Sequence, residues 1–270
     1  MHTSPAAARR QFLAGMASQV GLPPEILAVP GVSVVSTAER ADTGIAACYR
    51  VDERLVIWTD PAVLDRVRQL DSNGRGVVPD AQALGAALEA LGLVWQWDIE
   101  ILLLGAPTVS AEASSPPLVV RGLDELDPAR DRVVRDFVAS CDPVDAEQAG
   151  LEYLGDAEAE LAEQAVSIVV DTSPDGPTAG QVVALASAID WAWDPAFADI
   201  AVVVHPSWRQ RGVARLAVAA TTRELREQGR LPLYRHDQSN IASAKVAAAV
   251  GFVGVASASG FRLADSGAPA

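Results

Sequence analysis

The stretch from Phe197 to Ala214 constrains the fold more than any other part of the chain. It begins with an apolar, β-prone run over residues 199–204 and then reaches Pro206. An Arg-x-x-Gly-x-Ala step starting at Arg209 follows and opens an apolar segment with helical spacing. The pattern predicts a buried strand, a short loop, and a helix over about residues 212–228.

The start of this helix suits a bound anion. The first N–H groups of a helix have no partner within it and lie at the positive end of its dipole. Gly212 and Ala214 carry almost no side chain, so a phosphate can approach the backbone closely. Arg209 and Arg211 add charge that pairs with phosphate oxygens. The loop therefore predicts a phosphate or pyrophosphate site, although the pattern alone is common on protein surfaces.

The elements around this loop predict a mixed sheet with helices on its faces. They follow one another in the order β-α-α-β-β-β-α-β-α-β-β. The expected strands cover residues 118–121, 165–170, 181–189, 199–204, 231–234, 252–256 and 261–263. The expected helices cover about residues 127–140, a stretch from about 143, 212–228 and 241–250. The predicted fold class is α/β, more narrowly an α+β mixed sheet.

The N-terminal part predicts a smaller α/β domain. Residues 45–51 and 55–59 have the pattern of a hairpin, and two helices are expected over about 60–70 and 80–91, with Asp60 capping the first. Trp95 and Trp97 lead into a strand over 99–104 and are expected to be core or interface anchors. Residues 105–118 are rich in Ser, Ala and Pro, which is typical of a linker. The predicted domains are residues 1–112 and 113–270.

A second segment strengthens the interpretation of the anion loop. Asn240 precedes a predicted helix that closes at Gly251-Phe252, after a strand that follows the first helix. With this segment, residues 118–263 resemble the GNAT superfamily of acyl-CoA-dependent N-acetyltransferases. Its Arg/Gln-x-x-Gly-x-Gly/Ala signature and the Val-x-Pro before it are matched by Val204, Pro206, Arg209, Gly212 and Ala214. The order of elements also matches that family.

The resemblance implies acetyl-CoA as a co-substrate and a set of residues that bind it. In the family, the strand before the loop parts from its neighbour and pairs with pantetheine through its backbone. The pyrophosphate lies on the N–H groups of the loop, and the Asn contacts the cofactor. By this resemblance the cofactor-binding residues are Val202, Val203, Val204, Arg209, Gln210, Arg211, Gly212, Val213, Ala214 and Asn240.

The resemblance also implies direct attack of a neutral amine on the thioester, with a backbone N–H stabilising the oxyanion. Asp199 lies where some members carry a glutamate, so it is the first candidate for the base, against an ordinary strand-end carboxylate. Arg235 occupies another position where members carry an acid. The tyrosine that protonates the thiolate in many members is replaced by Ala247. Tyr234, Ser243 or a water then remain as candidate acids.

Charge excludes one class of function and indicates a ligand class. The net charge is −14, whereas a protein that binds nucleic acid without sequence preference needs a basic surface. Residues 113–204 hold 18 acidic and 4 basic residues, and residues 205–270 hold 9 basic and 4 acidic ones. The basic end suits a polyanionic ligand and the acidic middle suits a cation. We therefore expect an amine acceptor that is a cationic small molecule or a peptide terminus, and no nucleic acid.

Cysteine and histidine usage indicates a reducing compartment and no metal. Cys48 and Cys141 are the only cysteines, which excludes a disulfide scaffold and suits the cytoplasm. The three histidines are scattered, so no metal site is expected. No apolar run approaches the ~18–20 residues of a transmembrane helix, so no membrane association is expected.

The N-terminus allows one competing interpretation. Residues 9–13, Arg-Arg-Gln-Phe-Leu, resemble a twin-arginine export motif. Gln19 and residues 23–25 interrupt the apolar segment that export requires. An amphipathic helix with Phe12, Met16 and Val20 on one face is the favoured interpretation.

The sequence therefore predicts a cytoplasmic acyltransferase that transfers an acetyl or short acyl group from acetyl-CoA to an amine. The N-terminal domain is expected to cover the acceptor side or to mediate self-association into a homo-oligomer. Two alternatives stay open: a catalytically degenerate module that binds acyl-CoA for regulation, and an unrelated α/β domain with a chance loop. The matching order of elements disfavours the second.

Overall fold

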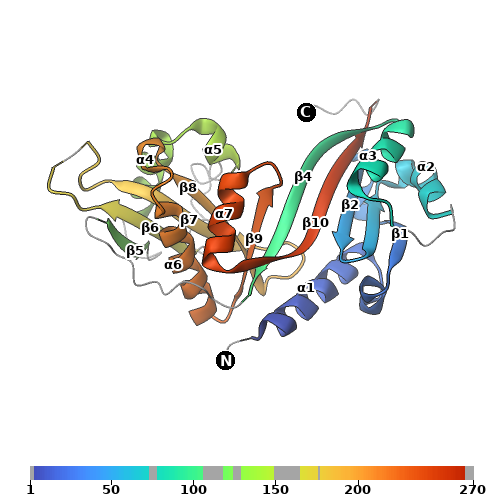
Figure 1. The fold of residues 1–270 in the computed structure, drawn as a ribbon, viewed down its shortest axis with the longest axis horizontal. Helices are drawn as coiled ribbons and strands as arrows, with labels where there is room; N and C mark the ends of the chain where they lie inside the picture. Colours follow the sequence, from blue (N-terminus) through green and yellow to red (C-terminus); the bar gives the residue numbers. More distant parts are fainter. Residues whose placement is uncertain are drawn as a thin grey trace. The chain divides into compact units, whose positions relative to one another are not determined.

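The computed structural model divides the chain into two compact units, each described here by itself (Figure 1). It describes residues 3–72, 78–105, 118–123, 129–148, 165–175 and 177–264. The C-terminal unit contains Met1–Pro5, Leu103–Arg235 and Ile241–Val253. The N-terminal unit contains Ala6–Leu102, His236–Asn240 and Gly254–Ala270.

The predicted domain boundary and linker fall largely outside the described residues, because residues 106–117 are not described. The two units do not correspond to a single cut along the chain. Gly254–Ala270, which the sequence analysis grouped with the second domain, belongs to the N-terminal unit. The two-domain division at residue 112 therefore stays a prediction.

The C-terminal unit is a mixed sheet with strand order β9-β8-β7-β6-β5. Its pairs are antiparallel except β8 with β9, which are parallel. The strands are β5 (Leu118–Leu123), β6 (Ala165–Asp171), β7 (Val182–Asp190), β8 (Phe197–Val204) and β9 (Leu231–Asp237). The helices are α4 (Arg130–Ser140), α5 (Pro143–Gln148), α6 (Val213–Glu227) and α7 (Ile241–Val250). This confirms the predicted fold class and the predicted order of elements from β5 to α7.

Helices cover both faces of this sheet. On one face, Phe137 of α4 packs in an apolar cluster with Leu185 of β7 and Val203 of β8. Leu185 and Val203 are paired residues, so their side chains share that face. Helix α6 lies against β6, β7 and β8, and buries Ala217, Val218 and Leu225. Strand β7 has apolar residues on both of its faces, as expected in a sheet that helices cover on both faces.

The N-terminal unit holds a second set of strands in the order β1-β3-β2-β10-β4. They are β1 (Gly31–Ser36), β2 (Ile45–Val51), β3 (Arg54–Thr59), β4 (Leu93–Leu104) and β10 (Phe252–Leu263). Strands β2 and β3 form the predicted hairpin. The helices are α1 (Pro5–Val20), α2 (Pro61–Ser72) and α3 (Ala81–Ala90). Phe12, Met16 and Val20 are buried on α1, which confirms its predicted apolar face.

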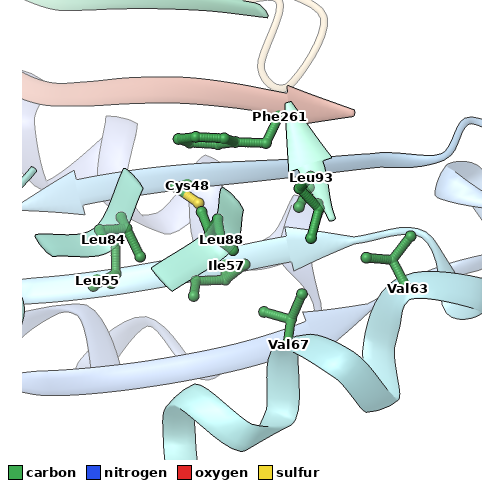
Figure 2. Packing of buried hydrophobic residues seen from close by; sticks show 10 residues of the cluster. Cys48, Leu55, Ile57, Val63, Val67, Leu84, Leu88, Leu93 and Phe261 are labelled. Carbon is green, nitrogen blue, oxygen red and sulfur yellow. The ribbon is translucent and has the colours of Figure 1, made fainter. Parts of the chain in front are cut away.

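The core of the N-terminal unit lies between its strands and helices α2 and α3. Figure 2 shows Val63 and Val67 of α2 and Leu88 of α3 directed at the side chains of Cys48 and Ile57 on β2 and β3. Aspartate caps fix the two helix starts. Asp60 Oδ1 accepts from the N–H of Ala62 at 2.7 Å, as predicted, and Asp80, whose capping role was not predicted, accepts through Oδ1 from the N–H of Ala83 at 2.8 Å. None of the helices that the structure describes is long and apolar enough to cross a membrane.

Three strand predictions were wrong or incomplete. Strand β1 was not predicted; it pairs in parallel with β3, a long-range contact that leaves no local signal. Strand β4 begins at Leu93 rather than Ile99, and so includes both tryptophans. The two strands predicted at 252–256 and 261–263 are one continuous strand, β10.

Gly260 explains why β10 was divided. It was predicted to lie between two strands, but it lies inside β10, where a Cβ atom would overlap the indole ring of Trp97 on β4. Glycine is required there for close packing of the ring and not for a turn.

We predict that Gly260→Ala destabilises the protein by about 1–3 kcal/mol, because the added methyl group overpacks the contact with Trp97. The measurement is the free energy of unfolding in urea. Gly254→Ala is the matched control on the same strand, because a Cβ there meets nothing within 4 Å. Equal losses for the two variants would contradict the packing role, and Trp97→Leu should restore part of the loss in Gly260→Ala.

Candidate functional site

The centre of the candidate site is the point where β8 and β9 part. Their parallel pairing runs from Phe197 with Leu231 to Ile200 with Tyr234. Both strands continue, but no further pair joins them within the described chain. On its other side β8 remains paired with β7 up to Val204. Residues 201–204 therefore keep one row of backbone N–H and C=O groups for a ligand to pair with.

The loop after β8 leads directly to the start of α6. The N–H of His205 donates to Val183 O at 2.9 Å, which fixes the end of the strand. Gln210 has φ 61° and Gly212 has φ 78°, so the loop contains two residues in the left-handed region. Gly212 is the N-cap of α6 without a capping side chain, and a Cβ there would meet nothing within 4 Å. The first N–H groups of α6 thus receive no capping side chain from the N-cap residue, and an anion could bind them in its place.

A chain of side-chain hydrogen bonds anchors this loop to the turn between β6 and β7. The indole N–H of Trp208 donates to Thr178 Oγ1 at 2.9 Å, and Thr178 Oγ1 donates to Asp171 Oδ2 at 2.8 Å. The guanidinium of Arg211 lies over the Trp208 ring, 5.0 Å from its centroid. Hydrogen bonds from Ser173 and Thr178 lower the pKa of Asp171, which keeps its acceptor oxygens charged. We call Asp171, Thr178 and Trp208 the loop anchor.

A second contact joins the loop to helix α5. Arg209 forms an ion pair with Asp145 of α5, and both side chains are about half exposed. This pair uses part of the hydrogen-bonding capacity of Arg209, whereas no ion pair joins Arg211 to another residue that the structure describes.

The structure places the predicted cofactor residues as follows. Val202, Val203 and Val204 lie on the part of β8 beyond its last pair with β9. Arg209, Gln210, Arg211 and Gly212 form the exposed loop, and Val213 and Ala214 begin α6. Asn240 comes directly before α7 in the chain but groups with the N-terminal unit, and its N–H donates to Asp237 O at 2.9 Å.

Asp199 is bound to Arg235. The Nε and Nη2 atoms of Arg235 lie 2.8 and 2.6 Å from Asp199 Oδ2. The Asp199 side chain is 12% exposed, and its Oδ1 atom is buried and bonded to no described residue. Burial raises the pKa of Asp199 above its usual 3.8, and the charge and hydrogen bonds of Arg235 offset part of that rise. The carboxylate is therefore a stronger proton acceptor than an exposed aspartate.

Tyr234 and Ser243 lie together on the other face of the sheet. Their hydroxyl oxygens are 2.9 Å apart, which joins β9 to α7. Burial raises the pKa of Tyr234 above 10.0; the hydrogen bond with Ser243 lowers it and the charge of Asp199 raises it. The phenol therefore keeps its proton at neutral pH. Ala247, at the position of the family tyrosine, is completely buried.

Sequence reasoning missed the residues that hold the site in place. Thr178 lies 30 residues from Trp208, and Asp145 lies 64 residues from Arg209, so neither contact has a local pattern. The one available signal was the tryptophan beside the loop, because a half-buried indole N–H needs an acceptor. No group of three or more potential metal ligands occurs among the described residues.

Comparisons with known proteins agree on the fold. The model of the acetyltransferase (GNAT) domain matches residues 123–253. The solved GCN5-related N-acetyltransferase from Sphaerobacter thermophilus is 14% identical, covers 80% of this chain and 76% of its own, and superposes with a TM-score of 0.51. No significant match was found among curated proteins.

Two further solved structures are similar at lower scores. A GCN5-related N-acetyltransferase-like protein from Streptococcus suis is 16% identical, with coverage of 81% and 83% and a TM-score of 0.46. A GNAT-family acetyltransferase from Colwellia psychrerythraea is 14% identical, with coverage of 77% and 76% and a TM-score of 0.47. The domain match assigns residues 123–253 to the GNAT superfamily of acyltransferases.

Proposed function

We propose that the protein transfers an acetyl or short acyl group from acetyl-CoA to an amine. The observation that carries the proposal is the continuity of the site: the free edge of β8 leads directly into the uncapped start of α6. An extended polar chain that ends in a pyrophosphate matches this sequence of a strand edge and an anion site. The match of residues 123–253 to the GNAT acetyltransferase domain supports the same chemistry.

The residues present fit acetyl-CoA. The backbone groups of Val202, Val203 and Val204 would pair with its pantetheine arm, and the N–H groups of residues 209–214 would hold the pyrophosphate. When bound, acetyl-CoA supplies the activated acyl group as a thioester.

Two side chains near the end of the β8–β9 pairing are suited to move protons. Asp199 accepts the proton of the ammonium form of the acceptor, which leaves the amine free to attack. Tyr234 holds a proton for the departing thiolate, with Ser243 bonded to its hydroxyl. Tyr234 is paired with Ile200, the residue after Asp199, so the two groups are on opposite faces of the sheet. This separation keeps the base and the acid apart.

The acceptor class and compartment follow from charge and cysteine chemistry. The acidic segment 113–204 favours an acceptor that arrives as a cation, such as an amine or a peptide terminus. We propose a cytoplasmic location because Cys48 and Cys141 are free and buried. Burial raises their pKa values to about 12 and about 11, so both thiols are unreactive.

A regulatory module that binds acyl-CoA without turnover is the second candidate. One observation favours it: Ala247 replaces the family tyrosine. The loop is common to both candidates, so only turnover separates them.

The experiment that tests the proposal combines calorimetry of acetyl-CoA binding with release of free thiol on a panel of amines. We expect binding together with thiol release on at least one amine class. Binding without release would support the regulatory module. A folded protein that does not bind acetyl-CoA would refute both candidates.

We predict that Asp199→Asn lowers kcat by about 10²–10⁴-fold, the usual contribution of a general base. The amide keeps the shape of the side chain, so the Kd of acetyl-CoA should change less than about twofold. Asp190→Asn is the control, because Asp190 also pairs with an arginine, Arg230, outside the site. Full activity of Asp199→Asn would exclude it as the base.

The pH profile gives a second readout of Asp199. Its carboxyl group is a base only when deprotonated, and burial raises its pKa above 3.8. The value of kcat/KM should therefore fall as the pH falls through that raised pKa, and Asp199→Asn should lack this acid limb.

We predict that Thr178→Val weakens acetyl-CoA binding by about 3- to 10-fold, since it removes the hydroxyl that joins Trp208 to Asp171. Affinity for acetyl-pantetheine, which lacks the pyrophosphate, should not change. Thr222→Val is the control, because the Thr222 hydroxyl is buried without a partner in the described structure. Equal weakening of both ligands would indicate general loosening of the fold instead.

A further inference from the structure

We propose that the acceptor is an amine with a neighbouring carboxylate, as in an α-amino acid, and that Arg235 binds this carboxylate beside Asp199. The inference rests on the proposed acyl transfer and names the substrate class of that site. Arg235 is the starting point, because it forms an ion pair with Asp199, the candidate base.

Arg235 uses only part of its bonding capacity on Asp199. Its Nε and Nη2 atoms are both directed at Asp199 Oδ2. A guanidinium has five N–H donors in a planar fork, so a second edge, formed by Nη1 and the other Nη2 hydrogen, remains. No described residue is bonded to Nη1, and the side chain is 41% exposed. This edge has the geometry that binds a carboxylate through two parallel hydrogen bonds.

An aromatic side chain holds the guanidinium in place. Arg235 lies over the ring of Trp191, 4.8 Å from its centroid. Trp191 is buried, and Trp193 packs edge-on against it at 5.0 Å between centroids. With Asp199 on one edge and Trp191 on one face, the fork is oriented before a ligand arrives. Such preorganisation reduces the entropy lost on binding.

The position of Arg235 is appropriate for an acceptor contact. Asp199 is paired with Leu233, so Arg235, two residues further along β9, projects from the same face as Asp199. That face also carries Val203, which packs with Phe137 of α4. Asp199 lies two residues before Ala201, the first residue of the free β8 edge. Arg235 and Asp199 are thus next to the proposed position of the thioester arm.

The charges of the pair complement those of a zwitterion. An ammonium group would be attracted to Asp199, and a carboxylate to the free edge of Arg235. Asp199 Oδ1 has no donor in the described structure, so a ligand ammonium would supply a missing hydrogen bond. A simple amine would satisfy only one member of the pair.

The test compares α-amino acids with the amines that lack only their carboxylate, such as phenylalanine with phenethylamine. We expect kcat/KM to be about 10- to 100-fold higher for the amino acid, as for a charge-assisted bidentate contact. Arg235→Gln should bring this ratio close to one, and Arg235→Lys, which keeps the charge without the fork, should give an intermediate ratio. A wild-type ratio near one, or an unchanged ratio in Arg235→Gln, would overturn the inference and leave acyl transfer intact.

Arg230→Gln is the matched control, because Arg230 also pairs with an aspartate of β7 and should leave the ratio unchanged. If no acceptor releases thiol, the proposed transfer fails, and the inference is tested by calorimetry of the same pairs on protein saturated with CoA. Carboxylate-dependent binding that is lost in Arg235→Gln would support the inference. Equal binding or no binding of the two partners would overturn it.

Discussion

The early end of the β8–β9 pairing is the constraint on which the candidate site depends. Because the pairing stops at Ile200 and Tyr234, the last part of β8 keeps a free backbone edge while β7 still holds its other side. The same point in the sheet sets Asp199 and Tyr234 on opposite faces. If β8 and β9 were paired along their whole length, β8 would have no free edge, and no ligand could pair with it next to these side chains.

The free edge of β8 can contribute to a binding site for acetyl-CoA only if the loop between β8 and α6 is held in a fixed position. Gly212 leaves the start of α6 open, but an open loop with left-handed residues needs restraints from elsewhere. The loop anchor supplies one through Trp208, and the ion pair of Arg209 with Asp145 supplies another. The proposed anion site would therefore be formed by the backbone and positioned by side chains from other elements.

Local sequence signals were enough to predict most of the fold, but they did not predict the features that depend on long-range contacts. Asp60, Asp80 and Gly212 mark helix starts through their own backbone neighbourhood, and the structure confirms the helices there. Strand β1 depends on a parallel partner, and Gly260 on a ring from β4, so no window of sequence contains the cause. The loop was predicted from its motif. The contacts that position it were not predicted, because Thr178 and Trp208 lie 30 residues apart and Asp145 and Arg209 lie 64 residues apart.

The Asp199–Arg235 pair is the point at which enzyme and binding module differ most. The sequence suggested that Arg235 removes an acid, but the structure shows that it stabilises one. Burying a carboxylate is unfavourable by several kcal/mol, and removal of the charge would relieve that penalty. A site that only binds acyl-CoA through backbone groups has no need of a buried carboxylate with a raised pKa and one oxygen that receives no hydrogen bond from the described residues. Strained titratable groups of this kind cluster where protons are transferred, which favours turnover over binding alone.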